Sequence, residues 1–306
     1  MKKHILGIFL ILMCLTSCKK NEQQSSSKLK IVAPENFLAD IASNIAGSRA
    51  DVTSIFPVGM DPHSFEPSVQ DAVKISGSSL IIINGGGLEP WVSDLIKNAG
   101  GNIPVVTASE GLKVRTPRAD EAAAEGESHE EGDPHFWMDP MLVIKYAENI
   151  RDGLSKIDSE GTAVYAKNTE AYIARLKDLD GEIRKMTDAV PAEKRLLVTN
   201  HESLGYFADE YNFTVVGTIL LSSSSMADPS AEQMASLIEE IQKTGTQAVF
   251  LENGSNTAVA EQISKEAHVK LVTGLYTHSL TDASGPASTY IDMIRYDAQI
   301  ITDALR

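Results

Sequence analysis

Cysteine is nearly absent from this chain of 306 residues, which has two cysteines, Cys14 and Cys18. Both lie near the start, so no disulfide framework is available to the rest of the chain. Basic charge is also scarce: 27 lysines and arginines stand against 42 aspartates and glutamates, a formal net charge of −15. This balance excludes a nucleic-acid-binding protein that works through a basic surface.

Common catalytic signatures are missing as well. His201-Glu202 is followed by Ser203-Leu204-Gly205, so the H-E-x-x-H motif of zinc proteases is not formed. The sequence also has no G-x-S-x-G nucleophile elbow, no P-loop and no repeat with a period of 20–50 residues. With 42% hydrophobic and 23% charged residues, the chain has the composition of a globular protein with one large core or two smaller ones.

The beginning of the chain has the layout of an export signal. A pair of lysines precedes the apolar run ILGIFLILMCL, which is too short to span a membrane comfortably. The run ends in LTSC, which resembles the lipobox of bacterial lipoproteins and implies cleavage before a lipid-modified Cys18. We therefore predict a signal peptide over residues 1–17 and a polar, lipid-anchored tether over residues 18–28.

From Leu29 onward, β-rich runs alternate with helical stretches. In the first half, the predicted strands LKIVAP, DVTSIFP, SLIIING and IPVVTA are separated by helical segments such as FLADIASNIAG. In the second half, RLLVTN, FTVVGTIL, AVFLEN and VKLVTGLY are separated in the same way. This alternation predicts an α/β fold with mainly parallel sheets and helices on their faces.

A long helical pattern separates the two halves. The segment TAVYAKNTEAYIARLKDLDGEIRKMTDAV repeats apolar residues at helical spacing, and a helix of about 28 residues would be about 40 Å long. A coiled-coil partner is one explanation, but we favour a backbone helix that runs along two α/β lobes. We assign residues 29–158 to the N-terminal lobe, 159–190 to the linking helix and 191–306 to the C-terminal lobe.

Four histidines fall where parallel sheets usually bind ligands. His201 and His278 directly follow predicted strands, His63 follows another after a few residues, and His135 lies beyond an acidic loop. Ligands bind beyond the carboxyl ends of such strands, and neutral imidazole is a good ligand for zinc and related ions. The spacings are far too long for a zinc finger, so the predicted site is assembled by the fold, with two histidines from each lobe.

The motifs around these histidines occur together in one known family. DPHSFEPS, DPHFWMDP, TNHESLGYFADEY, FLENGSNTAVAEQISKEA and LYTHSL followed by TYIDMIRYDA appear in that order between Leu29 and Arg306. The chain thus resembles the TroA/ZnuA-type zinc- and manganese-binding solute-binding proteins of bacterial ABC transporters. The resemblance implies a metal held between two lobes, with His63, His135 and His201 on the first three ligand positions.

The fourth ligand position departs from the family pattern, because family members usually carry Asp where this chain has His278. We favour His278 as the fourth ligand; water, Glu202 or Glu252 could fill the place instead. Glu66, Asp139, Glu202 and Glu252 are also candidates to hold the second nitrogen of a ligand imidazole. An imidazole-rich set suits zinc and carboxylates suit manganese, so zinc is the predicted metal, with manganese or iron as the alternative.

Residues 115–132, RTPRADEAAAEGESHEEG, break the α/β rhythm and form a predicted mobile acidic loop. Zinc-specific relatives tend to carry an insertion rich in histidines and acids just before the second ligand, and this loop has a single histidine, His129. The loop either gathers cations near the site or is a solvated linker.

Together these features predict an extracytoplasmic lipoprotein that captures a divalent transition metal and delivers it to an ABC-transporter permease. We expect a monomer that performs no catalysis, binds no nucleic acid, and contacts a bacterial membrane through the lipid on Cys18. A secreted zinc-dependent hydrolase is the rival if His278 leaves an open coordination position for water. An adhesin would use the same anchor. The permease and the kind of envelope, periplasm or cell surface, stay open.

Overall fold

The computed structural model describes residues 28–116, 132–220 and 229–306. Cys18 and His129 lie outside the described residues. The strands are β1 (Leu29–Ala33), β2 (Ala50–Ser54), β3 (Leu80–Ile83), β4 (Val105–Thr107), β5 (Leu196–Thr199), β6 (Thr214–Thr218), β7 (Ala248–Glu252) and β8 (Lys270–Leu275). The helices are α1 (Asn36–Ala46), α2 (Val69–Ser76), α3 (Val92–Asn98), α4 (Val143–Ile157), α5 (Thr162–Asp188), α6 (Gly205–Tyr211), α7 (Ala231–Thr244), α8 (Thr257–Ala267) and α9 (Tyr290–Leu305).

The N-terminal lobe contains a parallel sheet with the strand order β2-β1-β3-β4. Side chains alternate between the two faces of a strand, and here both faces are covered. Ile31 and Leu80 pack into the core on the side of α1 and α4, whereas Val32 and Ile81 pack on the side of α2 and α3. The continuous apolar runs of β1 and β3 follow from this double burial.

The C-terminal lobe has two parallel strand pairs, β5–β6 and β7–β8, and β5 lies next to β7. Leu197 and Phe250 face the same core as α6 and α9, and Val198 and Val249 face a second cluster with α7 and α8. Every strand pair in the described part of the chain is parallel, so the predicted sheet type is confirmed.

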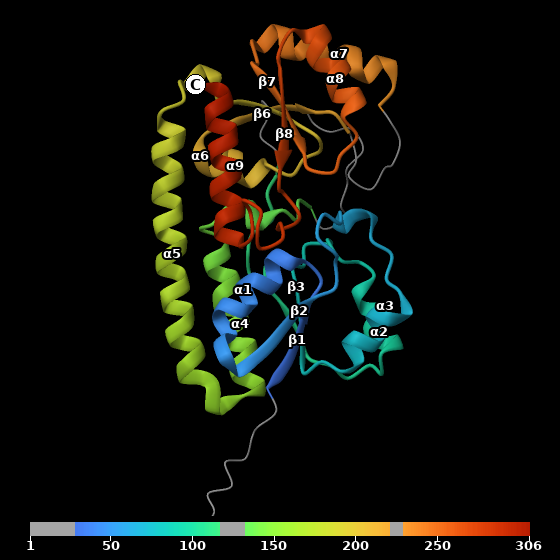
Figure 1. The fold of residues 1–306 in the computed structure, drawn as a ribbon, viewed down its shortest axis with the longest axis vertical. Coiled ribbons are helices and arrows are strands. Elements are labelled where there is room, and N and C mark those ends of the chain that lie inside the picture. Colours follow the sequence, from blue (N-terminus) through green and yellow to red (C-terminus); the bar gives the residue numbers. More distant parts are fainter. Residues whose placement is uncertain (1–27, 117–131, 221–228) are drawn as a thin grey trace, which may run out of the picture.

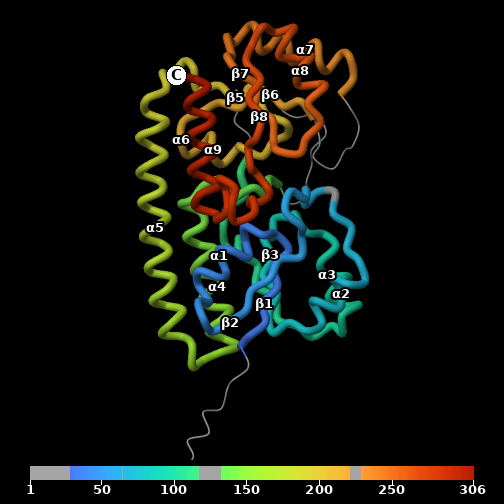
Figure 2. The backbone as a smooth tube through the Cα atoms, in the orientation of Figure 1, coloured from blue at the N-terminus to red at the C-terminus, as the bar shows by residue number. Residues whose placement is uncertain are grey.

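Helix α5 runs along both lobes at one side of the molecule (Figure 1). Its 27 residues span about 40 Å, and a short turn at Ser159–Gly161 precedes it. It packs on α1 and α4 of the N-terminal lobe and on α9, as the backbone trace in Figure 2 also shows. Helix α9 in turn contacts strands β7 and β8 of the other lobe. The predicted fold class is therefore confirmed; the exact lobe boundaries at 158/159 and 190/191 stay predictions.

One hydrophobic core connects the two lobes. The largest cluster of buried side chains includes Ile31 of β1, Leu179 of α5, Phe250 of β7 and Ile294 of α9. Because the same packed side chains support both sheets, a wide rotation of one lobe against the other would have to break this core. Within the described residues, no helix combines the length and the hydropathy needed to cross a bilayer.

The buried stripe of α5 gives a direct test of this shared core. Leu176 is fully buried in it, so Leu176→Ala should lower the free energy of unfolding by about 2–5 kcal/mol, through lost burial and a residual cavity. Urea unfolding followed by circular dichroism measures the change. The matched control is Lys177→Ala on the exposed face of the same helix, which should change stability by less than about 0.5 kcal/mol. Equal effects of the two substitutions would contradict the packing described here.

Candidate metal centre

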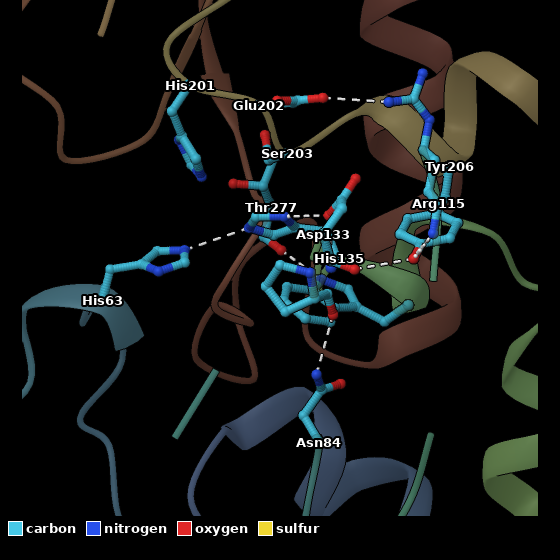
Figure 3. A network of polar contacts seen from close by, with 12 residues as sticks. His63, Asn84, Arg115, Asp133, His135, His201, Glu202, Ser203, Tyr206 and Thr277 are labelled. Atoms are coloured by element: carbon cyan, nitrogen blue, oxygen red, sulfur yellow. Dashed lines mark hydrogen bonds and ion pairs between the residues drawn. The ribbon is translucent and has the colours of Figure 1, made fainter. Parts of the chain in front are cut away.

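The four predicted histidines meet between the lobes. His63 lies in a short turn after β2, His135 directly precedes the turn Phe136–Met138, and His201 and His278 follow β5 and β8. One ring nitrogen of each residue lies within 4.8 Å of those of the other three. Figure 3 shows His63, His135 and His201 approaching one another from different segments of the chain. The carboxyl ends of strands from both lobes thus supply one cluster, as the strand positions predict.

The spacing of the imidazole nitrogens fits a tetrahedral ion. The Nε2 atom of His135 lies 3.3 Å from Nε2 of His63 and 3.1 Å from Nε2 of His278. Zinc–nitrogen bonds of about 2.0–2.1 Å in tetrahedral geometry separate the nitrogens by about 3.3–3.4 Å. These two separations are close to that value, and all four ligand nitrogens lie within 4.8 Å of one another, so the cluster is compact enough to be a candidate site for a zinc-sized cation.

Carboxylates hold the opposite nitrogen of the rings. His135 Nδ1 lies 2.8 Å from Asp133 Oδ1, and His201 Nδ1 lies 3.1 Å from Glu252 Oε1. In each pair the carboxylate accepts, so the proton is on Nδ1 and the lone pair of Nε2 faces the centre. This orientation is the one that a metal ligand requires.

Glu252 supports two rings at once. Its Oε2 lies 3.5 Å from Nδ1 of His278, which also lies 2.9 Å from the Thr277 hydroxyl, and Ser203 donates to Oε1 at 2.9 Å. The rings of His201 and His278 stack with centroids 4.9 Å apart. Burial by itself would raise the pKa of the Glu252 carboxyl, but the imidazoles of His201 and His278 hold it well below its usual value. Glu252 is thus a fixed negative charge behind the ring pair.

The centre is shielded from water. His135, His201 and His278 are 1%, 3% and 6% exposed, and His63 is half-buried. Burial, together with the three neighbouring imidazoles, lowers the pKa of His135 well below its usual value. This residue therefore stays neutral, and ready to bind a metal, at a pH where free histidine is already protonated.

Aromatic packing completes the shield. Trp137 and Phe136, next to His135, are buried, and the Trp137 ring centroid lies 5.1 Å from that of His135 and 5.8 Å from that of His278. The Trp137 Nε1–H donates to the backbone carbonyl of Thr277 at 2.7 Å, which fixes one lobe against the other beside the site. This agrees with a packing role for the aromatic residues of the DPHFWMDP motif.

Asp133 is a supporting residue that sequence reasoning missed. Its Oδ1 accepts from both the backbone N–H and Nδ1 of His135, at 2.9 and 2.8 Å. The signal was the D-P-H tripeptide, which occurs twice: Asp61 Oδ1 likewise accepts from the backbone N–H of His63 at 2.9 Å. Burial raises the pKa of the Asp133 carboxyl to about 7, and the negative charge of Glu202 also acts to raise it.

The other candidates have different surroundings. Glu66 is exposed, and Asp139 accepts from the backbone N–H of Met141 at 2.7 Å. Glu202 pairs with the guanidinium of Arg115 at 3.2 Å. Arg115 is the first residue of the segment predicted as a mobile loop; it lies outside the helices and strands, and its side chain is 2% exposed and paired with Glu202 and Asp209. These partners are remote in sequence, so local composition could not indicate them.

The sequence of this chain matches a known protein family. Residues 31–304 match the family model described as ZnuA, "Zinc-uptake complex component A periplasmic". The chain belongs to the ZnuA family. This membership confirms the predicted class, a metal-binding, substrate-binding protein of an ABC transporter. Because the family and these relatives are transport proteins, the prediction that the chain is not an enzyme is also confirmed.

Two curated relatives and one solved structure illustrate the family. The metal ABC transporter substrate-binding lipoprotein SsaB of Streptococcus sanguinis is 34% identical over 314 residues, covering 99% of each chain. The manganese ABC transporter substrate-binding lipoprotein ScaA of Streptococcus gordonii is 32% identical, covering 98% of this chain and 96% of its own. The periplasmic zinc-binding protein TroA of Treponema pallidum superimposes with a TM-score of 0.80 at 27% identity, covering 91% and 99% of the two chains.

The double support by Glu252 generates a prediction. Glu252→Gln should weaken zinc binding by about 10- to 100-fold, because one amide oxygen cannot accept from both His201 and His278 or supply a negative charge. Competition with a chromophoric chelator measures the affinity. Glu170→Gln, on the exposed face of α5, is the matched control and should bind like wild type. Equal affinities of all three proteins would show that Glu252 does not orient the rings.

Proposed function

We propose that this protein captures one divalent transition metal ion outside the cytoplasmic membrane and delivers it to the permease of an ABC transporter. Zinc is the metal that we propose, with manganese or iron as the alternative. The observation that carries the proposal is the convergence of four imidazole nitrogens on one point between the lobes. His63, His135, His201 and His278 are the proposed ligands. The metal is the cargo, so a closed four-ligand set without a position for a reacting water suits the task.

The ligand set supports zinc over manganese. Four neutral imidazoles offer borderline nitrogen donors, which zinc binds well in tetrahedral geometry, whereas manganese prefers carboxylate, carbonyl and water oxygens. Asp133 and Glu252, which could offer oxygens, are instead hydrogen-bonded to Nδ1 atoms of His135 and His201. Because ScaA is named for manganese and TroA for zinc, membership of the family leaves the choice of metal to experiment.

Delivery to a permease also requires that the protein stay near the membrane. The relatives SsaB and ScaA are named as lipoproteins, and the LTSC sequence that ends at Cys18 supports the same modification here. We propose that the diacylglyceryl group on Cys18 anchors the folded part, with residues 19–28 as the tether. Mass spectrometry of the membrane-extracted protein, compared with Cys18→Ser, tests this step.

The metal is tested by elemental analysis of residues 19–306 after exposure to equal zinc and manganese, on wild type and His278→Asp in parallel. We expect wild type to retain one zinc that excess manganese does not displace. The Asp variant should take up manganese more readily, because a carboxylate oxygen replaces one imidazole. Identical behaviour of the two proteins would place His278 outside the coordination shell, and the absence of metal from both would refute the proposed function.

Metal affinity should depend on pH. A ligand imidazole must be neutral, so protons compete with zinc as the pH falls through about 6.5, the ordinary pKa of histidine. The lowered pKa of His135 delays this competition at that ring but does not remove it from the set. We expect the zinc affinity to fall steadily from pH 7.5 to pH 5, measured against a chelator whose own protonation is corrected. An affinity that stays flat over this range would be incompatible with four imidazole ligands.

A further inference from the structure

A serine hydroxyl next to the proposed metal centre connects the two lobes. Ser279 directly follows His278, and its Oγ accepts hydrogen bonds from Asn36 Nδ2 at 2.9 Å and from the backbone N–H of Gly59 at 2.7 Å. The same hydroxyl donates to the backbone carbonyl of Leu280 at 3.1 Å. A hydroxyl has one donor and two acceptor positions, so its whole capacity is used. Ser279, which is 8% exposed, is thus a buried bridge between the lobes.

The two partners of Ser279 belong to separate segments of the N-terminal lobe. Asn36 is the first residue of α1, and its Oδ1 accepts from the backbone N–H of Leu280 at 2.8 Å, so the other lobe holds both ends of its amide. Gly59 lies in the segment that leads from β2 to His63. We call the hydrogen bonds of Ser279 with Asn36 and Gly59 the Ser279 bridge. The bridge ties this segment and the start of α1 to the chain that carries the fourth histidine.

The segment that contains Gly59 leads to the most accessible of the four histidines. His63 is half-buried, whereas the other three are at most 6% exposed. A groove of about 720 Å³ lies beside the centre and is lined by residues of both lobes, among them Gly59, His278 and Ser279. Residues 58–61 form part of its wall. Movement of this segment away from the other lobe would therefore widen the groove next to His278.

We propose that Ser279 is a positioning residue that sets how fast the metal leaves the centre. Its hydroxyl holds Gly59, and with it the segment that leads to His63, against the other lobe, and this contact has to break before the segment can move. Ser279 acts through the backbone of residues 59–63 and is not itself a ligand. The inference rests on the proposed function, since it concerns the same centre, but the bridge can also be measured without a metal.

The kinetic test compares zinc dissociation from the full mature chain and from its Ser279→Ala variant, by stopped-flow transfer of zinc to an excess of chromophoric chelator. We expect the dissociation rate constant to rise about fivefold or more, because two hydrogen bonds that oppose opening are lost. The association rate constant should change by less than about twofold, since the four imidazoles stay in place and such substitutions act mainly on dissociation.

The matched control is Ser264→Ala. Ser264 is 9% exposed, and its hydroxyl donates to the backbone carbonyl of Glu261 within α8, so the contact does not cross between the lobes. We expect zinc to leave this variant at the wild-type rate.

Hydrogen exchange of the metal-free protein measures the bridge directly. The Gly59 N–H donates to Ser279, so peptides that contain residues 57–61 should exchange faster in Ser279→Ala than in wild type. Peptides from α5 should exchange alike in the two proteins, because the bridge has no contact there. A general loss of packing would change both sets of peptides, so this readout separates it from the loss of the bridge.

Asn36→Ala is a second variant, which leaves Ser279 in place and keeps the test decisive if the serine variant folds poorly. It removes the contact with α1 and should also raise the rate of zinc dissociation. In the double variant Asn36→Ala/Ser279→Ala, the rise should be smaller than the product of the two single rises, because both substitutions break the same bridge. Rises that multiply in full would show that the two residues act independently.

Three further outcomes would overturn the inference. A dissociation rate of Ser279→Ala within about twofold of wild type would mean that the bridge does not limit release. Faster release without faster exchange at residues 57–61 would mean that Ser279 acts on its neighbour His278. Equal rises in Ser279→Ala and Ser264→Ala would mean that the protein is loosened in general. These results leave the proposed function intact, whereas a wild-type protein that binds no metal would refute the proposed function and the role of Ser279 in release, even where exchange confirms the bridge.

Discussion

The mutual orientation of four imidazoles is the constraint on which the centre depends. The Nε2 atom of His135 lies 3.3 Å from that of His63 and 3.1 Å from that of His278. Two lone pairs at such a distance repel each other unless a proton or a cation lies between them. Carboxylates orient the rings through their Nδ1 atoms: Asp133 contacts His135, and Glu252 contacts His201. Because the negative charges lie in this outer ring, a divalent cation at the centre gains both direct ligands and favourable longer-range attraction.

The fold makes this arrangement rigid. Two of the four histidines come from each lobe, and the lobes are joined by α5, α9 and one continuous core. Around His278 the chain is fixed on both sides: Asp297 accepts from the backbone N–H of Tyr276 at 3.0 Å, and Asn36 accepts from that of Leu280 at 2.8 Å. Preorganised ligands lower the conformational entropy lost on binding, which favours high affinity over large movement.

Much of the fold and the clustering of the four histidines could be predicted, and the reasons are local. The apolar runs of β1 and β3 and the 27-residue helix α5 carry their periodicity in consecutive residues, and His201 and His278 follow strands whose ends define a sheet edge. The supporting contacts depend on pairs far apart in sequence. Glu252 was a candidate without a known position, and Arg115 was assigned to a loop because neither Glu202 nor Asp209 is near it in the chain.

The family motifs and the residues particular to this chain account for different parts of the centre. The resemblance to the family implies three of the histidines and the two-lobed fold, whereas His278 stands where the resemblance leads us to expect a carboxylate. Glu252 contacts the Nδ1 atoms of His201 and His278, and Glu202 pairs with the buried guanidinium of Arg115. Both carboxylates therefore have charged or imidazole partners outside the cluster of Nε2 atoms, and such outer contacts orient the rings that form it.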